Sequence, residues 1–148
     1  MQPFPHRYVV RAKASEESPI VLDSPGLDVL ISAPPREFEG PGTMWSPETL
    51  LVGAVCDCFI LTFRAISRAA KLQWTQLTCQ GTGTVARDSE GITRFTAIDL
   101  KVQLEVTNSA EWEKATQLLE KTKKSCLVSN SLRLTPSLHM DVSVKQAA

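Results

Sequence analysis

The sequence has no excess of charge of either sign, because sixteen Lys and Arg residues balance sixteen Asp and Glu residues. Without a net positive field, we expect neither a nucleic-acid partner nor a membrane partner. Cysteine is scarce, and four thiols in 148 residues are too few for a disulfide-stapled scaffold. They are therefore expected to stay reduced in a reducing compartment unless function oxidises them.

Long hydrophobic runs are also missing. The longest, residues 50–63, is interrupted by Asp57 and is expected to be too short to span a bilayer. The first residues, MQPFPHRYVV, lack a basic start followed by an apolar run, so we expect no signal peptide and a cytoplasmic location. The two histidines lie too far from the cysteines for a zinc spacing, and no metal or cofactor is expected.

The elements predicted along the chain suit one domain over residues 1–148. Short strands are predicted at 7–13, 19–23 and 27–32, followed by a proline-rich loop at 33–47. Ser46 and Pro47 then predict the start of a helix that continues to about residue 71. Because this helix is apolar nearly all round up to Phe63, we expect it to be buried.

The second half predicts two long strands joined by DSEG at 88–91, a helix and a final strand. The second long strand alternates strictly, with Ile98, Leu100, Val102, Leu104 and Val106 on one face, as in an antiparallel strand with one wet face. Asn108 and Glu111 predict a capping box for the second helix, whose core stripe is expected to reach Cys126. A last strand is predicted at 134–144. The order predicts an α+β fold with an antiparallel sheet packed on a long central helix.

Each cysteine, taken alone, suits the role of a small apolar filler. Cys56 and Cys58 lie two apart on the predicted helix, where side chains do not face each other, so they are poor disulfide partners. Cys79 alternates with Leu77 on a strand face and is interpreted as filler, as is Cys56. Cys58 and Cys126 differ only through the residues around them.

Those surroundings resemble a known family. The segment SPETLLVGAVCDCF at 46–59 is similar to the helix opening of the osmotically inducible protein C and organic hydroperoxide resistance family (OsmC/Ohr). SCLVSNSL at 125–132 resembles the family's second signature, usually Cys-Pro-Val-Ser, and REFEGPG at 36–42 resembles the arginine segment of the OsmC branch. The similarity extends from about residue 26 to 142. Asp57, Cys56 and Leu127 depart from the family pattern, and the arginine loop is two residues longer.

The resemblance implies an OsmC-like fold, a homodimer and a thiol-dependent peroxidase. It implies that Cys58 attacks the hydroperoxide, that Cys126 resolves the resulting sulfenic acid as a disulfide, and that a dithiol reductant such as a lipoylated protein restores the thiols. Arg36 is the implied active-site arginine, with Arg11 as the fallback, and Glu48 would hold its guanidinium. This assignment makes chemical sense because a thiolate needs a positive neighbour and a carboxylate can bind a guanidinium in two places.

The spacing of Glu48 and Cys58 adds a dimer prediction. They are ten residues apart, which is about 15 Å on a straight helix. Either the helix breaks near Gly53 or Glu48 serves Cys58 of a second chain, and the apolar run favours a continuous helix and an intertwined dimer. Two alternatives stay open: a non-catalytic dimer that binds a small apolar ligand, and a cysteine redox sensor.

Overall fold

The chain divides into two compact units, which are described one at a time. The computed structural model describes residues 2–146. The first unit is Met1–Leu50 and the second is Leu51–Ala148. The prediction of a single domain over residues 1–148 stays a prediction.

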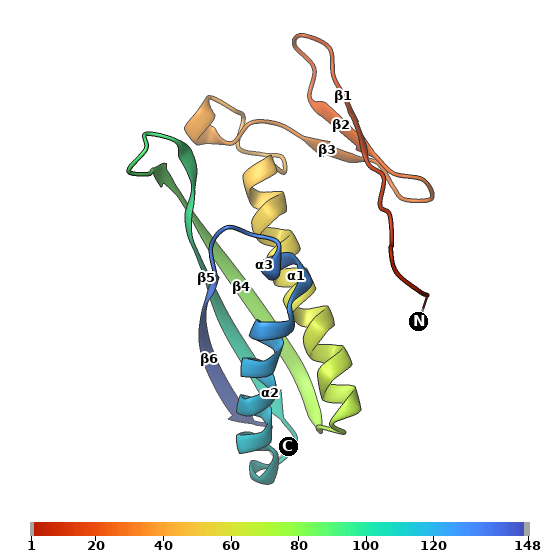
Figure 1. Ribbon diagram of the computed structural model, residues 1–148, viewed down its shortest axis with the longest axis vertical. Coiled ribbons are helices and arrows are strands. Elements are labelled where there is room, and N and C mark those ends of the chain that lie inside the picture. The colour runs from red at the N-terminus through yellow and green to blue at the C-terminus, as the bar shows by residue number, and fades with distance from the viewer. Residues whose placement is uncertain (1, 147–148) are drawn as a thin grey trace. The chain divides into compact units, whose positions relative to one another are not determined.

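The first unit contains a three-stranded antiparallel sheet in the order β1-β2-β3 (Figure 1). Its strands are β1 (Arg11–Lys13), β2 (Ile20–Asp23) and β3 (Leu30–Ser32), so the three predicted strands are confirmed in shorter form. The predicted loop holds the short 3-10 helix η1 (Arg36–Phe38) and folds back on its own start. There, the Ala33 N–H donates to the Trp45 carbonyl at 2.9 Å.

Helix α1 (Pro47–Ala69) begins where the sequence predicts and runs through Gly53 without a break. The Ser46 hydroxyl accepts from the Thr49 N–H at 3.2 Å, and the Thr49 hydroxyl accepts from the Ser46 N–H at 2.8 Å. This reciprocal pair satisfies two backbone donors, so Thr49 performs the task that Glu or Gln performs in a capping box. The prediction of a continuous helix is confirmed.

Within the described chain α1 buries one stripe, so burial of its remaining faces in a dimer stays a prediction. Val55, Phe59, Phe63 and Ser67 recur every fourth residue and are the buried positions. Leu61, on another face, is 52% exposed. The physical reason is that a single sheet face can cover only one side of a helix.

The length of α1 corrects the expectation about a membrane span. The helix has 23 residues, and its most apolar window has a mean hydropathy of 1.8, so length and composition would suffice to cross a bilayer. Residues 47–49 and 64–69 extend the helix beyond the run interrupted by Asp57. The mostly buried core helix of a soluble protein satisfies the same criterion, whereas 17% of this window of α1 is buried.

The second unit is built on a three-stranded sheet with the order β4-β5-β6. β4 (Trp74–Arg87) and β5 (Thr93–Val106) form the predicted antiparallel hairpin. Its turn is held by Asp88, whose Oδ1 accepts from the N–H groups of Glu90 and Ile92 at 2.8 and 3.0 Å. Gly91 has φ +76°, a left-handed conformation that glycine adopts without strain.

The third strand, β6 (Ser137–Val144), pairs parallel to β5, so the sheet is mixed rather than wholly antiparallel. Between them the chain forms η2 (Ser109–Glu111), α2 (Trp112–Ser125) and α3 (Leu127–Asn130). This is a helical crossover, which returns the chain to the starting end of β5 and makes the next strand parallel. The sequence predicts the strand correctly, but its direction depends on the path of the crossover.

The start of the second helix also differs from the prediction. Asn108 caps η2, because its Oδ1 accepts from the Ala110 N–H at 3.0 Å, and α2 begins only at Trp112. Glu111 therefore does not complete a capping box. The indole N–H of Trp112 donates to the Val142 carbonyl at 3.1 Å and attaches the first turn of α2 to β6.

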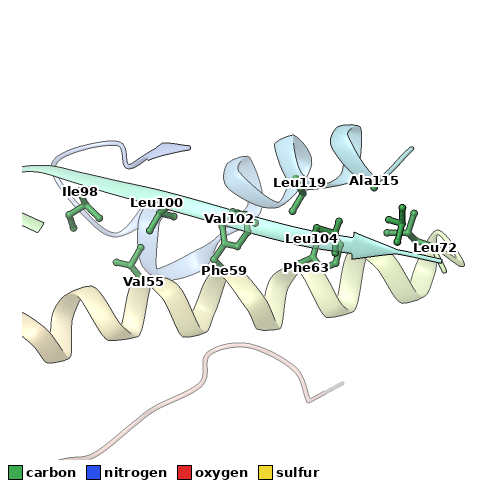
Figure 2. Packing of buried hydrophobic residues seen from close by; sticks show 11 residues of the cluster. Val55, Phe59, Phe63, Leu72, Ile98, Leu100, Val102, Leu104, Ala115 and Leu119 are labelled. Atoms are coloured by element: carbon green, nitrogen blue, oxygen red, sulfur yellow. The ribbon is translucent and has the colours of Figure 1, made fainter. Parts of the chain in front are cut away.

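The core of the second unit lies between the sheet and its helices (Figure 2). Val55, Phe59 and Phe63 from α1 point toward the alternating apolar residues of β5, and Leu119 of α2 closes the same cluster. The five β5 residues predicted to share the inner face are each at most 1% exposed: Ile98, Leu100, Val102, Leu104 and Val106. The strict alternation thus identified the buried face of the sheet.

Candidate active site

Cys58 lies one residue before the fully buried Phe59, at the edge of the stripe by which α1 packs on the sheet. Its side chain is half-buried. The Val128 N–H donates to the Cys58 Sγ at 3.5 Å, and the Thr62 hydroxyl, one helical turn along, lies 3.9 Å from the same sulfur. The Val128 contact joins positions seventy residues apart, and no sequence signal pointed to it.

Cys126 is fully buried and occupies the single residue between α2 and α3. Its backbone is extended, with φ −68° and ψ 111°, so α2 ends at Ser125. Of the predicted stripe on α2, Ala115, Leu119 and Thr122 are buried and Leu118 is half-buried, and Cys126 continues the stripe from the turn beyond the helix. The turn is tied by the Asn130 side chain, which donates to the Lys124 carbonyl at 3.1 Å.

The structure brings Cys58 and Cys126 together, and both are free thiols. Burial raises the pKa of the Cys126 thiol, hydrogen bonds with Ser129 oppose that rise, and the hydrogen bond to Cys58 adds to it. Cys126 therefore favours the protonated form beside Cys58. Cys58 is thus a half-buried sulfur that accepts a backbone hydrogen bond. Cys126 is a buried thiol that keeps its proton.

Two residues beside these cysteines, Asp57 and Leu127, depart from the family pattern, and both are compatible with the pairing of Cys58 and Cys126. Asp57 is exposed, whereas Cys58 is half-buried, because neighbouring helix positions diverge by about 100°. Leu127 is 67% exposed and occupies the first position of α3. The N–H at that position has no partner inside a helix, so leucine can replace proline there.

The predicted arginine and glutamate lie in the first unit. Arg36 is in η1, and its side chain packs against the backbone of Gly42, whose φ is +68°. Arg11 donates from Nε and Nη2 to Oδ1 of Asp23, at 2.9 and 2.7 Å, across β1 and β2. The Oε2 atom of Glu48 is buried and has no hydrogen-bond partner among residues 2–146, and no Arg36–Glu48 ion pair is formed within that range.

Comparisons with known proteins identify the family of this chain. The family model for OsmC-like proteins matches residues 40–141. This chain belongs to the OsmC-like family. A relative from Bacillus subtilis, the uncharacterized protein YmaD, is 27% identical over 127 residues, covering 84% of this chain and 83% of its own.

Solved structures share the OsmC-like fold. An OsmC-like protein of unknown function from Vibrio cholerae has a TM-score of 0.80 and 17% identity, with 94% of this chain and 100% of that chain covered. An organic hydroperoxide resistance protein from Legionella pneumophila has a TM-score of 0.72 and 20% identity, with 96% and 100% covered. The resemblance inferred from the two cysteine motifs is confirmed, and so is the α+β OsmC-like fold.

The OsmC-like chain holds a second thiol contact, which the sequence interpretation missed. Cys56 of α1 and Cys79 of β4 were both expected to be fillers, yet their thiols share a hydrogen bond. That bond, together with one from the Gly81 N–H, lowers the pKa of Cys56 to about 7 against the opposing effect of burial. The Cys56 bond and burial raise the pKa of Cys79. The only sequence signal was the alternation of Leu77, Cys79 and Gly81 on one face of β4.

The described residues offer no cluster of metal ligands and a small cavity beside Phe59. Among residues 2–146, no three His, Cys, Asp or Glu side chains are arranged to hold a metal ion. A cavity of about 170 Å³ in the second unit is lined by Phe59, Leu100 and Leu132 among others. Pockets for small organic ligands commonly measure about 300–1,000 Å³, so this cavity is small for that purpose.

Proposed function

We propose that this OsmC-like protein is a thiol-dependent peroxidase that reduces organic hydroperoxides. The contact between Cys58 and Cys126 carries the proposal, because sulfenic acid chemistry needs a second thiol within reach. Further support comes from the family, whose solved structures include proteins named for organic hydroperoxide resistance.

In the proposed reaction, the Cys58 thiolate attacks the terminal oxygen of the hydroperoxide. The O–O bond breaks, the alkoxide takes up the proton that the Cys58 thiol lost on ionising and leaves as the alcohol, and Cys58 becomes a sulfenic acid. The Cys126 thiol then attacks the Cys58 sulfur, and the hydroxyl group leaves with the Cys126 proton as water. The Cys58–Cys126 disulfide that remains is returned to two thiols by a dithiol reductant, for which a lipoylated protein is our candidate.

Arg36 and Glu48 complete the proposed site from a second copy of the chain. Along the unbroken helix α1, Glu48 and Cys58 are separated by about 15 Å, too far for a Glu48-bound arginine to serve the thiol of the same chain. The buried and unpartnered Oε2 of Glu48 is an acceptor that Arg36 could satisfy in a dimer. We favour Arg36 over Arg11, because the Arg11 guanidinium already binds Asp23.

The experiment compares the wild type with Cys58→Ser and Cys126→Ser after one equivalent of cumene hydroperoxide. Intact mass and free-thiol count are followed with time. The proposal expects rapid loss of two thiols in the wild type, a dimedone-trapped sulfenic acid in Cys126→Ser, and loss of the rapid reaction in Cys58→Ser. Slow and equal oxidation of all three proteins would overturn it.

The alternatives are addressed by the same reagents. A redox sensor would close the Cys58–Cys126 disulfide but would not sustain turnover with dihydrolipoamide. A binder of apolar ligands has less support from two cavities of the second unit: the one beside Phe59 measures about 170 Å³, and one of about 380 Å³ over β4, β5 and β6 is lined mainly by polar side chains such as Gln80, Lys101 and Asp141. A cytoplasmic location completes the proposal, because free thiols persist in a reducing compartment.

A further inference from the structure

The second pair of cysteines lies where α1 packs on β4. Cys79 and Gly81 are two residues apart on β4, so they share the strand face that is half-buried. A Cβ atom on Gly81 would lie 2.7 Å from the Cys56 Sγ and 2.7 Å from Val52 of α1. A side chain at this position would therefore have to displace the Cys56 sulfur or the Val52 side chain, and glycine lets that sulfur rest on the strand beside Cys79.

The immediate surroundings of this pair distinguish it from ordinary core filling. The Cys56 sulfur lies against Gly81, and hydrogen bonding from Cys79 and from the Gly81 backbone lowers the pKa of the Cys56 thiol. Both side chains are half-buried, in contrast to the sealed core residues next to them, such as Val55 and Phe59. A thiol packed as filler needs no donors, whereas an attacking thiolate needs both donors and access.

We propose that Cys56 and Cys79 form a second redox-active dithiol, which closes to an intramolecular disulfide by exchange with a small-molecule disulfide. The Cys56 thiolate attacks one sulfur of the disulfide, whose S–S bond breaks and releases one thiolate. Cys79 then attacks the Cys56 Sγ, and its proton leaves with the second small thiol. The dithiol loses two electrons, and the small disulfide gains them as two thiols.

The roles within the pair follow from its asymmetry. Cys56 favours the thiolate near neutral pH because its pKa falls to about 7, whereas the raised pKa of Cys79 keeps that thiol protonated until the mixed disulfide has formed. At pH 7 Cys56 would hold about fifty times the thiolate of a thiol with pKa 9.0. Lower basicity reduces nucleophilicity by about tenfold, so a net gain of about fivefold in rate is expected.

The test uses the double variant Cys58→Ser/Cys126→Ser, in which Cys56 and Cys79 are the remaining thiols. It is treated with glutathione disulfide at pH 7. The proposal expects two thiols lost per chain, two glutathione thiols released, no glutathione retained, and a tryptic peptide pair joined through Cys56 and Cys79. The rate is expected to exceed that of the same chain unfolded in urea by about fivefold.

Two results would overturn the proposal: glutathione that stays attached to Cys56, or a folded chain that reacts no faster than the unfolded one. If the double variant fails to fold, peptide mapping of the wild type under the same conditions replaces it, and absence of the Cys56–Cys79 peptide pair counts against the proposal.

A matched variant, Cys56→Ser/Cys79→Ser, separates this inference from the proposed function. Cumene hydroperoxide should still close Cys58–Cys126 in that variant. If it does not, the peroxidase proposal fails while the second dithiol stands. If it does, and glutathione disulfide does not close Cys56–Cys79 in the other variant, only the second dithiol is lost.

Discussion

The two cysteine pairs of the second unit start from one helix and end on different elements. Cys58 and Cys56 are two residues apart on α1, which turns their side chains about 200° away from each other. Cys58 therefore meets Cys126 in the turn between α2 and α3, whereas Cys56 meets Cys79 on β4. In both pairs the helix thiol accepts a backbone N–H, from Val128 in one and from Gly81 in the other.

Cys126 and Cys79, the partners of the two helix thiols, differ in burial. That difference separates the roles expected of the two pairs. Cys126 is fully buried, so a disulfide formed with it would be shielded from solvent until a reductant reaches the site. Cys79 lies on a half-buried strand face, where a small disulfide has better access. Proximity of two thiols is therefore not sufficient to assign a role to them, because burial and hydrogen-bond donors decide which reagent each pair meets.

The largest effect that would separate the pairs is loss of the peroxide reaction in Cys58→Ser. We expect hydroperoxide consumption to fall by about 1,000-fold or more, the scale on which removal of a nucleophile acts. Cys56→Ser is the matched control on the same helix and should stay within about twofold of the wild type. Stopped-flow consumption of cumene hydroperoxide measures both, and equal losses would erase the distinction between the pairs.

Cys126→Ser should separate the two half-reactions of the first pair. The first oxidation of Cys58 should change by less than about twofold, whereas steady-state turnover with a dithiol should fall by about 100-fold because no internal thiol resolves the sulfenic acid. A dimedone adduct on Cys58, read by mass spectrometry, reports the trapped species. A Cys126→Ser protein that turns over normally would assign resolution to another thiol, with Cys79 the first to examine.

The pH dependence of alkylation should identify Cys56 as the reactive member of its pair. In Cys58→Ser/Cys126→Ser, the iodoacetamide rate should rise with pH and reach half its maximum near pH 7, because alkylation requires the thiolate and the pKa of Cys56 is lowered to about 7. Adding Cys79→Ala removes the donor that lowers this pKa most. The rate at pH 7 should then fall by up to about fivefold, because hydrogen bonds to a charged group contribute about 1.5–3 kcal/mol and the more basic thiolate that remains is a better nucleophile. An alkylation midpoint above pH 8.5 in Cys58→Ser/Cys126→Ser, without Cys79→Ala, would contradict the proposed difference in pKa between Cys56 and Cys79.

A side chain at Gly81 should disturb the second pair more than the first. Gly81→Ala places a Cβ 2.7 Å from the Cys56 Sγ, and we expect exchange with glutathione disulfide to slow by about threefold as Cys56 moves from its backbone donor. Gly83→Ala is the control, because it crowds Val52 and Phe95 instead of Cys56. Equal slowing in both would attribute the effect to general strain between α1 and β4.

The smallest effect is expected at Asp57. Its side chain is exposed and diverges from both helix thiols by about 100°, so Asp57→Asn should change the peroxide and exchange rates by less than about twofold. Measurement at low and high salt checks this, since screening would remove any contribution that the carboxylate makes through solvent. A salt-dependent change larger than fivefold would place the carboxylate in the electrostatics of one pair.

Much of the second unit follows from local sequence. The alternation of β5, the cap at Ser46 and the hairpin turn at Asp88 each depend on neighbouring residues, and all three agree with the structure. The two cysteine motifs likewise identified the OsmC-like family. Local rules succeed at these positions because hydrogen bonds and side-chain periodicity within one element determine them.

Other features needed the tertiary structure. The direction of β6 depends on the crossover, and the position of Cys126 beyond α2 depends on where that helix meets α3. The pairing of Cys56 with Cys79 depends on the rotation of α1 over β4, and a small change of that rotation would separate the two sulfurs. The sequence by itself identified the long helices, most of the strands, the buried face of β5 and the family. Only packing between distant elements decided which thiols touch, because such contacts are made by residues that no local pattern connects.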